Sequence, residues 1–251
     1  MPFLTARALV IYSSIHRESD RILHLLTKEH GVIRCTASGA AKSGSQFSFA
    51  AQPGILLDVT LNQSRNYWYV KELEVVEAFR NIHEDIMYLT AAAHLLEIGR
   101  DVCVDIDTCK DVFSLLLHAF HAMNHHKKEY RLVVMAVEWK MAEVLGFPVA
   151  LDKEWMENAE YAFFSFSDCR FYVKGKGNIK NKEDYQTLSK SSLQALCHMQ
   201  TVPLEKLFSF SLSDSVLEEL CYLSHRYLCE RLEKNYSKLE LLTNQWNLHD
   251  S

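Results

Sequence analysis

The sequence predicts an α+β protein in which a small five-stranded antiparallel β-barrel precedes a bundle of α-helices. Two observations support this prediction. Before residue 77, apolar and polar residues alternate as they do in half-buried strands. Beyond Phe79, apolar residues recur at helical spacing, and the 251-residue chain contains only 8 glycines and 4 prolines, so few turns are expected.

Five strands are expected in the N-terminal part. The first ends at a polar turn that contains Glu18, and four more cover residues 21–27, 32–37, 55–61 and 67–76. Closing so few short strands into a barrel removes the exposed sheet edges. We interpret the Gly- and Ser-rich residues 38–54 as a mobile loop, because they are too many for a hairpin turn.

The first two helices are predicted from their start signals. Asn81 with Glu84 has the spacing of a capping box, and Thr108 with Asp111 opens the next helix.

Three more helices are expected at 129–145, 191–199 and 213–233. The first of these is apolar almost all round, which is typical of a helix at the centre of a bundle, and Gly146 ends it. Residues 152–181 are aromatic and then basic, and we interpret them as a small β-like hairpin inserted into the helical part.

The charge distribution favours two domains, which we place at 1–79 and 80–251. The net charge is −5, yet residues 1–71 contain eight basic and four acidic side chains and so carry +4, which leaves −9 for the rest. Such asymmetry is typical of two modules with different partners. A chance distribution remains the alternative.

Several classes of protein are disfavoured by the composition. No uncharged stretch exceeds 15 residues, whereas a membrane-spanning helix needs roughly 20 mainly apolar residues. The opening residues lack the pattern of an export signal. The 7 cysteines are odd in number and include no CxxC pair, which suits a reducing cytosol. We therefore expect a cytoplasmic protein.

Signals for catalysis or metal binding are weak. GxSxG, HExxH and a phosphate-binding Gly-rich loop are missing, and Cys169 stands alone in the insert, where a zinc site would need four ligands. His118, His121 and His125 share one helix face and could bind a metal, but we interpret them as its polar border. We expect no enzyme activity, metal or cofactor; a hydrolase assembled from His94, His118 or His121 is the least favoured alternative.

Basic residues interleaved with aromatic ones favour nucleic-acid binding by the barrel. Cations along phosphates and flat rings under bases are what single strands require. One alternative is that Trp68 lies in the barrel core and the arginines form a solvated rim. Another is a protein-interaction scaffold whose barrel binds a peptide. The candidate DNA-binding residues are Arg7, Arg17, Arg21, Arg34, Lys42, Arg65, Tyr67 and Lys71.

Several stretches resemble the bacterial recombination mediator family RecO over nearly the whole chain. The best markers are the turn Glu18-Ser19-Asp20 and the segment Leu145-Gly146-Phe147. Further similar stretches are ARALVIYSSIHRESDRILHLLTKEHGVIRCTASGA, AAQPGILLDVTL, LEVVEAF and LGFPVALD.

This resemblance implies an oligonucleotide/oligosaccharide-binding (OB) barrel followed by a helical domain. It also implies a non-enzymatic repair protein, associated with the nucleoid, that binds single- and double-stranded DNA and anneals complementary strands. The implied partners are RecR, RecA and the acidic, phenylalanine-ended tail of single-strand binding protein (SSB). Candidate residues for that tail are Lys127, Lys128, Arg131 and Lys140.

The sequence departs from the family pattern at two places. Many members carry four cysteines in the insert, but only Cys169 is present here, so the insert resembles a degenerate zinc finger without metal. The loop after the third strand is usually strongly basic, whereas here Lys42 is its one basic residue. We therefore place more weight on the arginines of the barrel.

Overall fold

The computed structural model describes residues 3–42, 44–125, 128–151, 159–172 and 184–239. The chain forms two compact units. The first is Met1–Lys127 with Tyr236–Ser251, and the second is Lys128–Asn235. This division differs from our boundary at residue 79, because the first helices group with the barrel.

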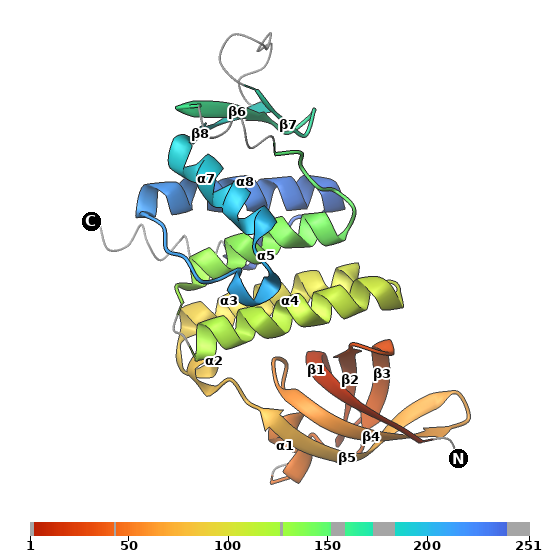
Figure 1. Ribbon diagram of the computed structural model, residues 1–251. Helices are drawn as coiled ribbons and strands as arrows, with labels where there is room; N and C mark the ends of the chain where they lie inside the picture. Colours follow the sequence, from red (N-terminus) through yellow and green to blue (C-terminus); the bar gives the residue numbers. More distant parts are fainter. Residues whose placement is uncertain (1–2, 43, 126–127, 152–158, 173–183, 240–251) are drawn as a thin grey trace. The chain divides into compact units, whose positions relative to one another are not determined.

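A closed five-stranded barrel forms the N-terminal part of the first unit, as the alternating pattern predicts (Figure 1). The strand order is β1-β2-β3-β5-β4. All neighbours are antiparallel except β3 and β5, which pair in parallel. The strands are β1 (Phe3–His16), β2 (Asp20–Thr27), β3 (Gly31–Ala37), β4 (Leu56–Ser64) and β5 (Tyr67–Glu77).

Every second side chain fills the barrel interior. On β1 these are Ala6, Ala8 and Val10, and on β2 they are Leu23 and Leu25. The period of two follows from the pleat, which sends successive side chains to opposite faces. The hydrophobic interior therefore fixes which residues face outward.

The stretch between β3 and β4 contains a short helix, α1 (Gln46–Ala50), where we expected a mobile loop. Ser45 caps this helix, and its Oγ accepts a hydrogen bond from the Phe47 N–H at 3.2 Å. Ala50 and Ala51 are buried in the barrel cluster. The prediction was wrong for the described part of this stretch, because its small apolar residues complete the core.

After the barrel, the first unit continues with helices α2 (Arg80–Glu84), α3 (Ile86–Val102) and α4 (Ile106–Asn124), and it also contains a 3₁₀ turn, η3 (Ser237–Leu239). Aspartates that the sequence analysis did not choose cap α3 and α4. Asp85 accepts from the Met87 N–H and Asp105 from the Thr108 N–H, both at 2.8 Å. The predicted starts at Asn81 and Thr108 were therefore wrong.

Asn81 has a tertiary role instead. Its backbone N–H donates to Asn124 Oδ1 at 3.0 Å, and its side-chain amide donates to the Asn124 carbonyl at 2.7 Å. These bonds join α2 to the end of α4.

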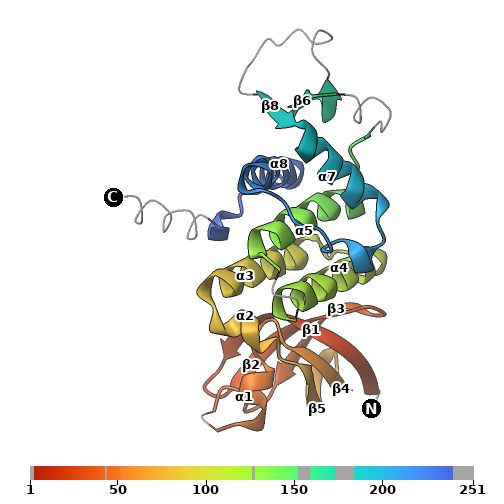
Figure 2. The same ribbon diagram turned by 60° about the vertical axis from the view of Figure 1, so that its left-hand side comes forward.

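Helices α3 and α4 cover part of the outer barrel surface. α3 contacts β1, and α4 contacts β2 and β3 (Figures 1 and 2). Leu9 and Leu26 are paired in the sheet, alternate with the interior residues and are fully buried. The outward apolar side chains thus explain why these helices belong to the unit of the barrel.

The second unit contains helices and a small sheet of order β7-β6-β8. Strand β8 lies beyond the predicted hairpin at 152–181, parts of which fall outside the described residues. α5 and α8 pack together. The elements are α5 (Tyr130–Val144), β6 (Tyr161–Ser165), β7 (Arg170–Tyr172), β8 (Tyr185–Ser189), α7 (Lys190–Thr201), the 3₁₀ turn η2 (Leu204–Lys206) and α8 (Asp214–Leu232).

Among the described residues, no helix has the length and apolar character needed to cross a membrane.

Candidate nucleic-acid interface

The outer surface of β2, β3 and β5 brings together an arginine and two tyrosines. Exposed Arg34 on β3 lies opposite His24 of β2. Thr36 pairs with Tyr69 in the parallel ladder, so Tyr67 and Tyr69 share the outward face with Arg34. Tyr67 is 67% exposed. A flat ring and a cation are therefore available on adjacent strands.

The intervening Trp68 points the other way. It pairs with Cys35 and packs against the barrel cluster. Its ring is partly buried against the barrel core, which favours the alternative stated for this residue from the sequence.

Two turns that border this surface each present an exposed arginine. Arg17 lies in the turn from β1 to β2, and Arg65 lies in the turn that leads into β5. Both have left-handed backbone conformations, with φ of 57° and 55°. Such a conformation costs a side-chain-bearing residue about 1–2 kcal/mol, and glycine or asparagine is the usual choice. We call Arg17, Arg34, Arg65, Tyr67 and Tyr69 the arginine–tyrosine face.

The remaining barrel candidates are engaged or lie elsewhere. Arg7 donates two hydrogen bonds to Asp58, at 2.9 and 2.8 Å, across the β1–β4 pair. This bidentate contact lowers the pKa of Asp58. The half-buried Arg21 donates to Ser13 Oγ at 3.1 Å. Lys71 Nζ lies 3.3 Å from Glu72 Oε1. The structure does not bring these three side chains to the arginine–tyrosine face.

The far half of β5 and the neighbouring β4 are acidic. Glu72 pairs with Thr60, and Glu74 pairs with Asp58. Both glutamates are exposed. The outer surface of β5 therefore changes from aromatic near Tyr67 to acidic near its end, and a polyanion is favoured only at the aromatic end.

A clamp holds the β1–β2 turn to the segment that carries exposed Lys42. Asp20 Oδ1 accepts from the Gly39 N–H at 2.8 Å, and the Ser19 carbonyl accepts from the Ala41 N–H, also at 2.8 Å. The Gly39 bond is the main reason that the pKa of Asp20 is lowered. This clamp gives a physical reason for the aspartate in the marker turn.

The described candidates for a partner tail are already paired. Lys127 lies outside the described residues. Lys128 Nζ donates to the Phe210 carbonyl at 3.5 Å. Arg131 forms ion pairs with Glu129 and with Asp214, the latter at 2.9 Å, and Lys140 lies 2.7 Å from Glu143. An acidic peptide would have to compete with these carboxylates.

The three histidines on α4 make separate contacts. His118 Nδ1 lies 2.8 Å from the Ser114 carbonyl. His121 stacks on His125, whose Nε2 lies 3.4 Å from Glu77. In the part of the chain that the structure describes, their ring nitrogens do not converge as metal ligands would. His94, the other residue considered for a hydrolase, is fully buried and packs edge-on against Tyr236.

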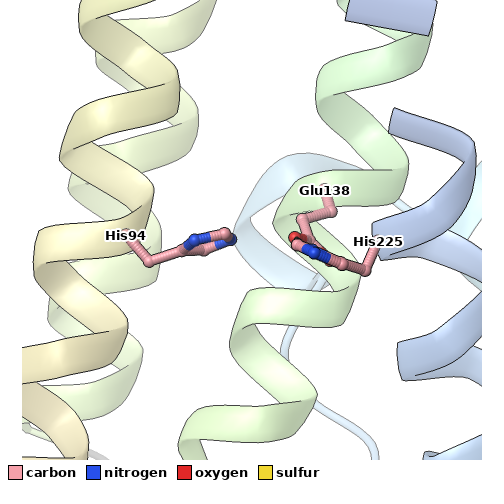
Figure 3. Close-up of side chains that lie close together, drawn as sticks. All are labelled: His94, Glu138 and His225. Atoms are coloured by element: carbon pink, nitrogen blue, oxygen red, sulfur yellow. The ribbon is translucent and has the colours of Figure 1, made fainter. Parts of the chain in front are cut away.

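A polar cluster that was not predicted from the sequence lies between α5 and α8. Glu138 is only 1% exposed, and His225 points toward it from α8 (Figure 3). Their closest atoms, Nδ1 and Oε1, lie 2.7 Å apart, and Ser224 Oγ donates to the other carboxylate oxygen at 3.0 Å. The signal available in the sequence was a single carboxylate within the apolar stretch 132–139. Figure 3 also labels His94, which belongs to α3 of the first unit.

Comparisons with known proteins agree with the resemblance over both parts of the chain. Residues 1–79 match the family model described as Recombination protein O N terminal, and residues 83–240 match Recombination protein O C terminal. The chain is 27% identical over 250 residues to the DNA repair protein RecO of Acetivibrio thermocellus, which covers 96% of this chain and 97% of that protein. It is 26% identical over 253 residues to that of a Thermoanaerobacter species, covering 99% and 100%. A shorter match, 30% identical over 143 residues, is to the RecO protein of Alkaliphilus metalliredigens and covers 57% and 58%.

Proposed function

The chain belongs to the recombination protein O (RecO) family of DNA repair proteins, and on this premise we propose that its barrel binds DNA along the arginine–tyrosine face. The observation that carries the proposal is that two exposed arginines, Arg17 and Arg65, stand in left-handed turns bordering the surface that carries exposed Tyr67. Backbone strain at exposed turns suggests selection for the side chain.

Binding at this face would rest on two physical terms. Arg17, Arg34 and Arg65 would neutralise phosphates and release counterions. Tyr67 and Tyr69 would stack with unpaired bases, which tolerates any sequence. OB barrels bind oligonucleotides on the face of strands 2 and 3 and on the adjoining loops, and the arginine–tyrosine face includes β3 and both bordering turns.

The wider role follows from family membership and is part of the proposal. The barrel would bind single- and double-stranded DNA and anneal complementary strands without breaking a covalent bond. With RecR, the protein would help load RecA on DNA coated with SSB, in the cytoplasm and at the nucleoid. Joining a DNA-binding unit to a partner-binding unit raises the local concentration of each component at the other.

A titration of fluorescent single-stranded oligonucleotide at low salt tests the proposal against the peptide-binding scaffold. We expect saturable binding whose affinity falls with added salt. Failure to bind at low salt would contradict the proposal and favour the scaffold.

Replacing Tyr67 with alanine separates stacking from charge. We expect Tyr67→Ala to weaken single-stranded DNA binding by about 1 kcal/mol, roughly fivefold, because stacked bases are worth about 1–3 kcal/mol. The salt dependence should not change, since no charge is removed. Anisotropy titrations over a range of salt concentrations measure both quantities. Tyr67→Phe keeps the ring and should bind as the wild type does; a loss in both variants would rule out stacking.

Replacing Asp214 with asparagine tests the partner site on α5. Asp214 is 84% exposed and occupies Arg131. If the acidic SSB tail binds Arg131, Asp214→Asn removes a carboxylate that competes for this arginine. A synthetic tail peptide should then bind about two- to threefold tighter, because an exposed ion pair contributes about 0.2–1 kcal/mol. Glu205→Gln makes the same charge change at another exposed site and is the control. Equal affinities in both variants would remove Arg131 from the site.

A further inference from the structure

A thiol, an imidazole and a carboxylate follow one another in the second unit. Cys229 Sγ lies 3.6 Å from His225 Nε2, one helical turn away on α8. The other ring nitrogen of His225, Nδ1, lies 2.7 Å from Glu138 Oε1 on α5. Figure 3 shows the imidazole and the carboxylate turned toward each other. The proposed DNA-binding function uses none of these side chains.

The carboxylate orients the ring. Glu138 is buried and also accepts a hydrogen bond from Ser224 Oγ, which fixes its position. It accepts the Nδ1–H of His225, so Nε2 faces the sulfur of Cys229. Hydrogen bonds with Cys229 and Glu138 raise the pKa of His225 to about 10, although partial burial opposes the rise. The imidazolium form therefore persists at neutral pH and can donate its Nε2–H to a thiolate.

Cys221, on the same helix, has the opposite environment. Burial raises its pKa to about 12. Its Sγ donates to the Arg131 carbonyl at 3.7 Å. This thiol stays protonated, whereas Cys229 is half-buried beside a cation. Only a thiolate is an effective nucleophile.

We propose that Cys229 is an oxidation site whose thiolate, paired with the His225 imidazolium, reacts with hydroperoxides to give a sulfenic acid. The sulfur attacks one peroxide oxygen, an S–O bond forms and the O–O bond breaks. The sulfur loses two electrons to the peroxide, and the leaving oxygen takes the proton from His225 Nε2, so that hydrogen peroxide yields water. Cys221 is eight residues away, about 12 Å along the helix, too far to form a disulfide with Cys229. A low-molecular-weight thiol would reverse the modification.

The two cysteines of α8 allow a test within one molecule. The full-length protein is treated with hydrogen peroxide in the presence of dimedone, which labels sulfenic acids, and labelled peptides are quantified by mass spectrometry. An ordinary thiol is only a few per cent ionised at neutral pH. A thiol that ionises more readily presents more thiolate, but each thiolate is a weaker nucleophile, which offsets part of the gain in rate. We therefore expect Cys229 to be labelled at least about tenfold faster than Cys221. Equal or slower labelling of Cys229 overturns the proposal.

A variant tests the part played by the imidazole. His225→Gln should lower the labelling rate of Cys229 about tenfold, while His30→Gln, at an exposed turn of the first unit, should not change it. Circular dichroism confirms that both variants are folded. An unchanged rate in His225→Gln overturns the assignment of His225, and the comparison of Cys229 with Cys221 in the wild type remains decisive if that variant does not fold.

Discussion

Reversing the three arginines of the arginine–tyrosine face lowers the affinity for single-stranded DNA roughly a hundredfold at 0.1 M salt. Each contact between a basic side chain and a single-strand phosphate contributes about 0.7 to the slope of log K against log [salt], which is about fivefold at this salt concentration. Three lost contacts therefore give roughly a hundredfold, and repulsion adds to the loss. The variant is Arg17→Glu, Arg34→Glu and Arg65→Glu, and the slope should flatten by about 2.

A second triple variant controls for net charge. Arg80→Glu, Lys110→Glu and Lys190→Glu change the charge equally at exposed helical positions. Because these positions lie outside the arginine–tyrosine face, we expect at most a few-fold loss and an unchanged slope. Equal losses of DNA affinity in the two triple variants would mean that binding depends only on the net charge of the protein and not on the arginine–tyrosine face.

Truncating Glu138 should destabilise the protein by about 3 kcal/mol in urea unfolding. Removing one partner of a buried ion pair leaves the other without compensation, which costs about 3–5 kcal/mol. In Glu138→Ala, the His225 imidazolium and the Ser224 hydroxyl both lose the carboxylate that they contact. Glu143→Ala, on the same helix, removes a carboxylate that is 35% exposed and paired with Lys140. It should cost under about 1 kcal/mol.

The difference between wild type and Glu138→Ala should also depend on pH. The pKa of His225 is raised from 6.5 to about 10 by its bonds to Cys229 and Glu138. Because this pKa is higher in the folded than in the unfolded state, protonated His225 stabilises the folded protein. The stabilisation is complete below about pH 6.5 and is lost as the pH rises through about 10. The stability gap should therefore be largest near pH 6 and narrow toward pH 10. A gap that widens over this range would contradict the charged pair.

Local patterns were sufficient for the strands of the barrel, and the exposed edges of so small a sheet predicted that it closes, but neither identified the pair of strands that closes it. The alternation of Leu57, Val59 and Leu61 predicts β4 because one face must be buried. The parallel pairing of β3 with β5, which places Tyr69 beside Thr36, joins segments that are not neighbours along the chain. Periodicity carries no information about such a pairing.

The helix starts show how tertiary contacts override local signals. Asn81 and Glu84 have the spacing of a capping box, but Asn81 bonds to Asn124, 43 residues away. Asp85 caps α3 instead. A polar residue near a helix start has several possible partners, and packing decides among them.

Tertiary contacts also separate the candidate DNA-binding residues into those that are already paired and those that stay exposed. Arg7 and Arg34 look alike in the sequence, yet the β1–β4 register places Arg7 beside Asp58, 51 residues away, while Arg34 stays exposed. Residue type predicted the chemistry of the barrel surface. The sheet register decided which cations remain available to a ligand.

Photo-cross-linking tests the central claim of DNA binding at the arginine–tyrosine face most directly. A single-stranded oligonucleotide containing 4-thiothymidine is bound to the full-length protein and irradiated, and the attached peptides are identified by mass spectrometry. We expect cross-links at Tyr67 or Tyr69, because these rings lie where the bases would stack. Cross-links confined to residues 128–235, or to the β1–β4 side around Asp58, would contradict the account.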